Sequence, residues 1–125
     1  MESLKGRDLL SMADLSGAEV SGIVKMAIEL KAGKLDPRTR QILGLLFTKA
    51  STRTRVSFTA AMYQLGGQVI DLNPNSTQIG RGEPLQDTAR VLDRYLDILA
   101  IRGRCGDAAQ SQRDVNCIGH RAGGK

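Results

Sequence analysis

Five consecutive residues, Ser51–Arg55, carry three hydroxyl groups and two guanidinium groups in the order S-T-R-T-R. They follow a short apolar run, Ile42–Phe47, and precede a pattern typical of a helix. Where a strand leads into a helix, backbone N–H groups and the positive end of the helix dipole favour an anion. The hydroxyl groups can donate to phosphate oxygens and Arg53 can offer two parallel N–H donors, whereas Arg55 is expected to point about a turn away. The segment therefore predicts a binding site for a phosphate ester.

The same residue types have a more ordinary explanation, in which a hydroxyl side chain caps the helix and the arginines are solvated. Two other polar elements favour the phosphate site, because parallel strands bring their carboxyl ends to one edge of a sheet. These elements are the loop Asn73–Glu83 and Arg102, which ends a third predicted strand. A single arginine at a strand end is usually a surface charge. Beside a phosphate site, such an arginine is expected to take part in binding the phosphate.

The elements that must position these residues begin with a helix near the N-terminus. Ser16 and Glu19 form a capping-box pattern, and the apolar residues that follow repeat at helical spacing until Gly33. The run Ile42–Phe47 is continuously apolar, which is typical of a strand covered on both faces and favours a parallel sheet.

Four further elements complete the pattern. Apolar residues after S-T-R-T-R predict a helix that ends at Gly66–Gly67. Gln68–Leu72 and Ile98–Arg102 are predicted strands, and Pro84 is expected to be the first residue of a helix between them. Alternating strands and helices predict an α/β fold with a parallel sheet and helices on both faces.

The chain of 125 residues is 41% hydrophobic, which allows one domain with a single core. Residues 1–102 are expected to form this domain. Residues 103–125 have no amphipathic period and end in A-G-G-K, so we expect a divergent, disordered tail. Both cysteines, Cys105 and Cys117, fall in this tail, and no disulfide framework is expected in the domain.

Charge and composition disfavour two classes of partner. The net charge of +5 is small and the four aromatic residues are scattered, so nucleic-acid binding is not expected. The longest apolar run is far too short to span a bilayer, and the first residues contain no signal-peptide pattern. We expect no membrane partner and a cytoplasmic location.

Three quoted stretches carry a family resemblance: "FTKASTRTRVSF", "QLGGQVIDLNP" and "STQIGRGEPLQDTARVLDRYLDILAIR". Together they resemble the carbamoyl-phosphate-binding domain of the aspartate/ornithine carbamoyltransferase family over about residues 3–102. The aspartate branch shares S-T-R-T-R, whereas "GRGE" and "DTARVL" are similar to the ornithine branch. The resemblance implies an incomplete N-terminal carbamoyltransferase domain.

The resemblance also implies an activity and a set of site residues. The family transfers the carbamoyl group of carbamoyl phosphate to the δ-amine of L-ornithine, giving L-citrulline and phosphate in arginine biosynthesis. It uses no metal or organic cofactor and forms homo-oligomers, usually trimers. Arg102 and Thr54 would be catalytic, because they can stabilise charge that develops on the carbonyl and the departing phosphate. The residues that match carbamoyl-phosphate ligands are Ser51, Thr52, Arg53, Thr54, Gln78 and Arg102, of which Gln78 would reach the site of a neighbouring subunit.

The pattern departs from the family after Arg102 or Gly103. The family continues with a His-Pro-x-Gln segment and a second domain that binds the amino acid. His120 is followed by Arg121 and is not matched to the family's catalytic histidine. We therefore expect a truncated or frameshifted fragment that lacks the ornithine site.

Two alternatives to an ornithine-specific transferase stay open. The chain could be a non-catalytic phosphate-binding or assembly-interfering subunit, or an aspartate carbamoyltransferase-like protein. A zinc site formed by Cys105, Cys117 and His120 is disfavoured, because structural zinc takes four ligands at closer spacing.

Overall fold

A computed structural model describes residues 4–47, 51–73, 85–104 and 114–120 of the chain. In these ranges four strands form one sheet, in the order β2-β1-β3-β4. The elements in chain order are a short 3-10 helix at Met12–Asp14, α1 (Gly17–Lys31), β1 (Ile42–Phe47), α2 (Thr52–Gln64), β2 (Gln68–Asp71), α3 (Leu85–Tyr95), β3 (Ile98–Arg104) and β4 (Asp114–His120).

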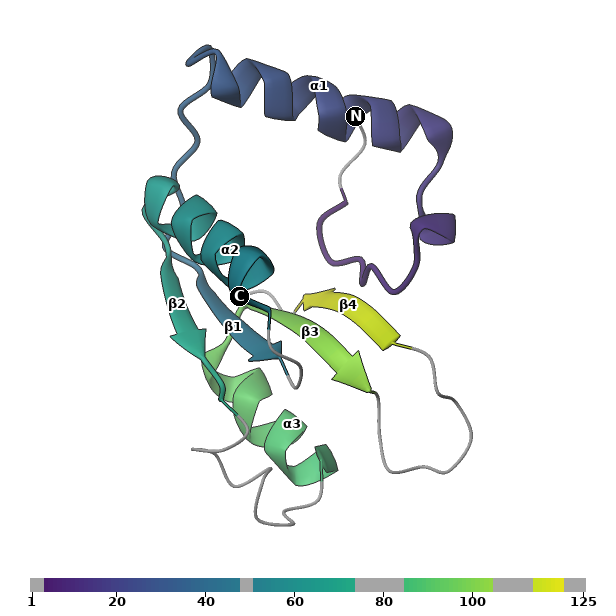
Figure 1. The fold of residues 1–125 in the computed structure, drawn as a ribbon, viewed down its shortest axis with the longest axis vertical. Coiled ribbons are helices and arrows are strands. Elements are labelled where there is room, and N and C mark those ends of the chain that lie inside the picture. The colour runs from purple at the N-terminus through teal and green to yellow at the C-terminus, as the bar shows by residue number, and fades with distance from the viewer. Residues whose placement is uncertain (1–3, 48–50, 74–84, 105–113, 121–125) are drawn as a thin grey trace.

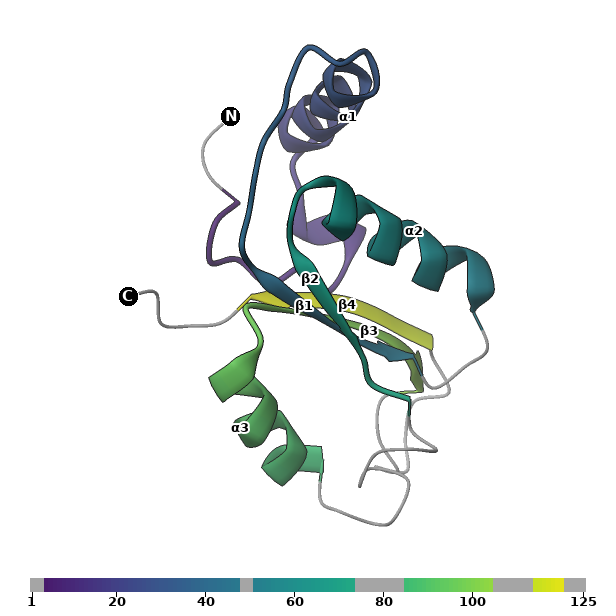
Figure 2. The same ribbon diagram turned by 90° about the vertical axis from the view of Figure 1, so that its left-hand side faces the viewer.

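The first three strands run parallel, with β1 between β2 and β3. Helix α2 covers one face of the sheet and α3 covers the other (Figures 1 and 2). This confirms the predicted α/β class with a parallel sheet and helices on both faces. As a result, the carboxyl ends of β1, β2 and β3 lie at one edge of the sheet, where α2 begins.

Strand β1 is the centre of the core. Leu45 is fully buried, and it pairs in register with Asp71 of β2 and Ala100 of β3. Met62 of α2 packs into the same cluster. On the α3 side Gly44 leaves no room for a side chain, because a Cβ atom there would collide with Leu96. Side chains therefore cover β1 on both faces, which explains why β1 is an unbroken apolar run.

Strand β4 differs from the expected tail. Residues 114–120, which are expected to have no regular structure, pair antiparallel with β3. The expectation rests on the low apolar content of the segment, but strand pairing satisfies backbone N–H and C=O groups whatever the side chains. The division of the chain at residue 102 stays a prediction. The third strand also runs two residues further than predicted, to Arg104.

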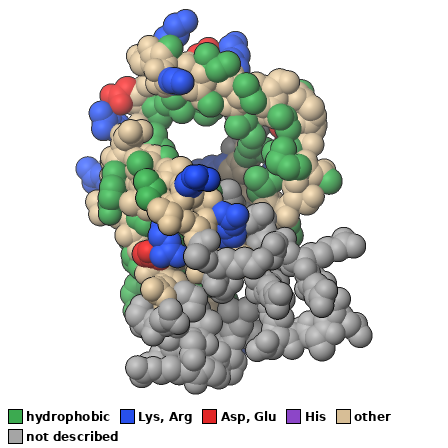
Figure 3. Space-filling view, viewed as in Figure 1, with side chains coloured by type: hydrophobic (Ala, Val, Ile, Leu, Met, Phe, Trp, Pro, Cys, Tyr) green, Lys and Arg blue, Asp and Glu red, His purple; other side chains and the backbone are tan. Residues whose placement is uncertain are grey.

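Helix α1 begins as predicted, behind the N-cap Ser16. The Ser16 hydroxyl accepts from the N–H of Glu19, and the Glu19 carboxylate accepts from the N–H of Ser16. That backbone bond and the guanidinium of Arg7 hold the pKa of Glu19 below its usual range. No residue of α1 is buried, and Figure 3 shows an opening between this helix and the rest of the molecule with hydrophobic side chains along it. No helix in the described ranges has the length and apolar character needed to cross a membrane.

Ser16→Ala is expected to destabilise α1 locally by about 0.5–2 kcal/mol, because it removes the side chain that caps the helix. The measurement is amide hydrogen exchange within α1, since a helix with no buried residue can unfold without the sheet. Ser21→Ala on the same helix is the matched control, and it should leave exchange unchanged or slower. Equal exchange in Ser16→Ala and wild type would contradict the role of the cap.

Candidate functional site

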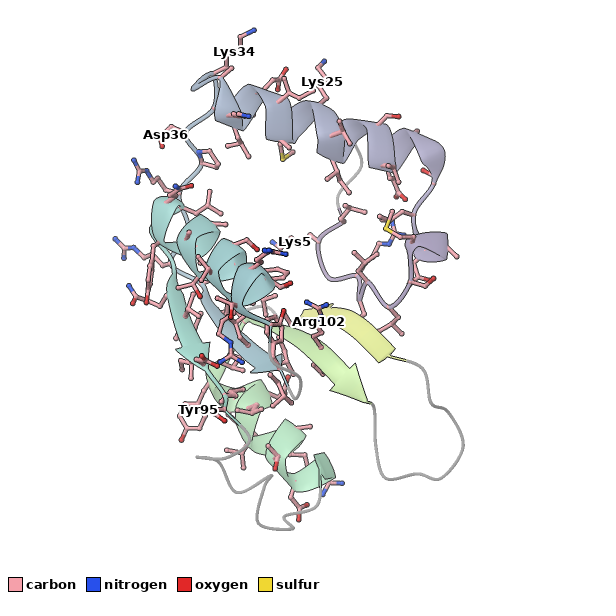
Figure 4. All side chains as sticks on the ribbon, viewed as in Figure 1. Lys5, Lys25, Lys34, Asp36, Tyr95 and Arg102 are labelled. Atoms are coloured by element: carbon pink, nitrogen blue, oxygen red, sulfur yellow. The ribbon has the colours of Figure 1, made fainter. Side chains whose placement is uncertain are left out.

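The site is centred on Arg102, near the end of β3. Its guanidinium Nη1 donates to the hydroxyl of Ser51 at 2.5 Å and to the hydroxyl of Thr54 at 2.6 Å. Figure 4 labels Arg102, which lies between β3 and the first turn of α2. Both acceptors are neutral hydroxyls, so neither contact cancels the charge of the guanidinium. The sheet edge therefore places the Arg102 guanidinium beside two hydroxyl groups.

Ser51 occupies the N-cap position of α2, but its side chain makes no capping hydrogen bond. Its hydroxyl accepts from Arg102 instead. The simpler explanation of S-T-R-T-R, in which a hydroxyl side chain caps the helix, is therefore not what Ser51 does. The first turn of any helix leaves backbone N–H groups without intrahelical partners, and these groups favour an anion at this end.

One stripe of α2 faces the sheet along its whole length. Its members are separated by three or four residues, which places them on the same side of a helix. At the C-terminal end of the stripe Phe58 and Met62 pack against the core. At the N-terminal end the stripe is polar, and Ser51, Thr54 and Arg55 are half-buried. The packing of the apolar half therefore sets the direction of the polar half.

Arg55 uses its guanidinium within the chain. Its Nη1 donates to the carboxylate of Asp71, the last residue of β2, at 2.8 Å. Its Cζ also lies 5.7 Å from the centre of the Phe47 ring, a cation–π distance. Arg55 thus lies on the β2 side of the site, whereas Arg102 lies on the β3 side.

The structure brings together three of the six predicted ligands, Ser51, Thr54 and Arg102. Thr52 and Arg53 are exposed on the same first turn of α2. Within the described part of the chain, the side chain of Arg53 makes no hydrogen bond or ion pair with another residue. Gln78 lies outside the described residues.

The Arg55–Asp71 pair is not part of the sequence prediction. The available signal is that Asp71 falls near the end of the predicted strand Gln68–Leu72, at the same edge as S-T-R-T-R. The described residues contain no group of three His, Cys, Asp or Glu side chains that could hold a metal ion.

Solved structures of two carbamoyltransferases are among those that resemble this fold. The crystal structure of ornithine carbamoyltransferase from Gloeobacter violaceus matches with a TM-score of 0.64 and 54% sequence identity, over 74% of this chain and 30% of that one. Aspartate transcarbamoylase from Trypanosoma cruzi, in complex with carbamoyl aspartate and phosphate, matches with a TM-score of 0.68 and 36% identity, over 79% of this chain and 34% of that one.

Curated relatives are more similar in sequence. Ornithine carbamoyltransferase from Thermosynechococcus vestitus is 72% identical over 102 residues, which is 82% of this chain and 33% of that protein. Ornithine carbamoyltransferase from Nostoc punctiforme is 62% identical over 122 residues, which is 98% of this chain and 38% of that protein. The chain thus spans about a third of the length of the curated relatives it matches.

A family profile described as aspartate/ornithine carbamoyltransferase, carbamoyl-P binding domain, matches residues 7–121. This match and that of the Nostoc protein extend past residue 102, near which the resemblance is expected to stop. The profile covers the whole sheet and the first turn of α2. The chain therefore belongs to the aspartate/ornithine carbamoyltransferase family, in which it corresponds to the carbamoyl-phosphate-binding domain.

Proposed function

We propose that this chain binds carbamoyl phosphate at the carboxyl edge of its sheet. The observation that carries the proposal is the double hydrogen bond from Arg102 to Ser51 and Thr54, which joins β3 to the start of α2. A guanidinium, two hydroxyls and a helix N-terminus together suit a small phosphate ester. Thr52 and Arg53 would supply further donors from the same turn, and Gln78 would come from a neighbouring subunit.

The proposed reaction is transfer of the carbamoyl group to the δ-amine of L-ornithine, giving L-citrulline and phosphate in arginine biosynthesis. When the amine attacks, negative charge develops on the carbonyl oxygen and on the departing phosphate. Arg102 and Thr54 would stabilise that charge, and such fixed donors act more strongly on the transition state than on the substrate. No step of this scheme calls for a metal or an organic cofactor.

Ornithine rather than aspartate is proposed as the acceptor because of the sequence identities. The three ornithine carbamoyltransferases named above are 54–72% identical to this chain, whereas the aspartate enzyme from T. cruzi is 36% identical. We propose that the chain acts in the cytoplasm as part of a homo-oligomer, which in this family is usually a trimer.

A second candidate is a non-catalytic subunit that binds carbamoyl phosphate or interferes with assembly. It is favoured by the composition of the predicted site, since all six matched residues serve carbamoyl phosphate and none serves the acceptor amine. In this case the chain would bind the phosphate ester without forming citrulline.

One pair of measurements tests the proposal and separates the two candidates. Carbamoyl-phosphate binding is followed by calorimetry at low temperature, and citrulline formation is assayed after L-ornithine is added. Wild type is expected to bind, and the double variant Arg53→Ala/Arg102→Ala to bind at least about 100-fold more weakly, because it loses charge-assisted hydrogen bonds. The double variant Arg38→Ala/Arg90→Ala is the matched control, since both arginines are largely exposed and the change in charge is the same.

The outcomes are distinct. Binding with citrulline formation, both lost in the site variant, supports the transferase. Binding without citrulline supports the non-catalytic subunit. Failure of wild type to bind carbamoyl phosphate at millimolar concentration would refute the transferase and the phosphate-binding form of the second candidate.

A further inference from the structure

The side chain of Arg55 follows Thr54 directly in the first turn of α2, but it takes no part in the group around Arg102. Its guanidinium is bound to the Asp71 carboxylate at 2.8 Å and lies over the Phe47 ring. The side chain of Arg55 is 29% exposed and that of Asp71 is 42% exposed. Ion pairs this exposed contribute little to stability, so stability alone does not account for the contact.

The position of this pair relative to Arg102 is the informative feature. The strand order β2-β1-β3 places β1 between the two neighbours. Ser51 and Thr54 join the first turn of α2 to β3 through Arg102. Arg55 joins the same turn to β2 through Asp71. The turn is therefore attached to the strands on both sides of β1.

Phe47 contacts Arg55 and Phe58 from the end of β1. It is the last residue of β1, pairs in register with Arg102, and is only 3% exposed. Its ring lies under the Arg55 guanidinium and meets the Phe58 ring edge to face, at 6.4 Å between ring centres. A rotation of α2 about its axis would have to break contacts on both sides of β1.

From these contacts we propose that Arg55 is a positioning residue of the carbamoyl-phosphate site. It holds the first turn of α2 in the rotation that directs the hydroxyls of Ser51 and Thr54 at Arg102. In this proposal Arg55 acts through Ser51 and Thr54 and not as a phosphate ligand, and its Nη1 donates to Asp71. The inference rests on the proposed function for its ligand, but the positioning can be measured without any ligand.

The decisive variant is Asp71→Ala, because the two explanations of Arg55 predict opposite signs. If charge alone matters, removal of a carboxylate and release of Arg55 should tighten the binding of an anion. If Arg55 positions the turn, the same variant should weaken carbamoyl-phosphate binding by about tenfold, since small misplacements of binding groups are costly. Asp36→Ala is the matched control. Asp36 also pairs with an arginine, Arg38, but both side chains are largely exposed, and Asp36 lies in the connection between α1 and β1 (Figure 4).

The second readout uses the free protein. The guanidinium protons of Arg102 are assigned by NMR, and their exchange with water is measured in wild type, Asp71→Ala, Arg55→Gln and Asp36→Ala. If Arg55 positions the turn, exchange should be faster in Asp71→Ala and Arg55→Gln, because the bonds from Arg102 to the two hydroxyls are populated less. No change is expected in Asp36→Ala.

The results separate the inference from the function on which it rests. Weaker binding and faster exchange in Asp71→Ala support positioning. Tighter or unchanged binding, or unchanged exchange, overturns it. If wild type fails to bind carbamoyl phosphate, the proposed function falls, and the exchange rates alone decide whether Arg55 positions the turn.

Discussion

Arg102→Ala is expected to weaken the binding of carbamoyl phosphate by at least about 100-fold. Arg102 is the group that joins β3 to Ser51 and Thr54, so its loss removes the guanidinium and also frees both hydroxyls to rotate. A hydrogen bond to a charged group contributes about 1.5–3 kcal/mol, and about 1.4 kcal/mol corresponds to a factor of ten in affinity. Two such bonds to the ligand would account for the expected loss. Calorimetric titration with carbamoyl phosphate is the measurement.

Arg102→Lys separates the charge from the shape of the group. An ammonium group keeps the positive charge but cannot offer two parallel N–H donors, so about tenfold weaker binding is expected of this variant. Arg90→Ala is the control for net charge, because Arg90 lies on α3, across the sheet from α2 (Figure 2), and is 78% exposed. Equal affinities for wild type and Arg102→Ala would show that Arg102 does not bind the ligand.

The meeting of Arg102 with Ser51 and Thr54 could be predicted from the sequence because these residues stand at the ends of elements. S-T-R-T-R follows the apolar run Ile42–Phe47, and Arg102 ends another predicted strand. In a parallel α/β fold, that information is enough to place both at one edge. Because both segments lie at this edge, Arg102 can contact the hydroxyls of Ser51 and Thr54.

The Arg55–Asp71 pair could not be predicted in the same way. It depends on β2 lying beside β1 on the side away from β3, and on which face of α2 is turned to the sheet. Sequence patterns give the period of a helix but not the neighbour of each strand. Arg55 is expected to point away from the phosphate, but its partner emerges only once the strand order is known.

Strand β4 marks another limit of sequence patterns. They detect side chains that are buried, whereas β4 is defined by backbone pairing with β3. Helix α1 illustrates the converse, because its predicted apolar stripe includes exposed side chains, with Val24 at 53% and Ile28 at 63%. The N-cap and the length of α1 can be predicted from the local sequence. The contacts of its apolar face cannot.

Leu45→Ala is expected to lower the free energy of unfolding by about 2–5 kcal/mol, the range for a large core side chain reduced to alanine. Leu45 is the one large side chain in the described residues that is fully buried, and it lies in the inner strand β1 between Asp71 and Ala100. The surrounding strands are held by their ladders and cannot close around the cavity. Such a loss is a large fraction of the 5–15 kcal/mol typical of a domain. Urea unfolding followed by circular dichroism is the measurement.

Leu10→Ala is the matched control for this variant. It deletes the same atoms from a side chain that is 60% exposed, and a surface change of this kind is expected to stay within about 0.5 kcal/mol of wild type. Because the same strand carries Phe47 at its end, Leu45→Ala should also weaken carbamoyl-phosphate binding, but only near its unfolding midpoint. Equal stability of Leu45→Ala and Leu10→Ala would mean that the core is not centred on β1. If Leu45→Ala bound carbamoyl phosphate weakly while still folded, β1 would have a direct part in the site beyond supporting it.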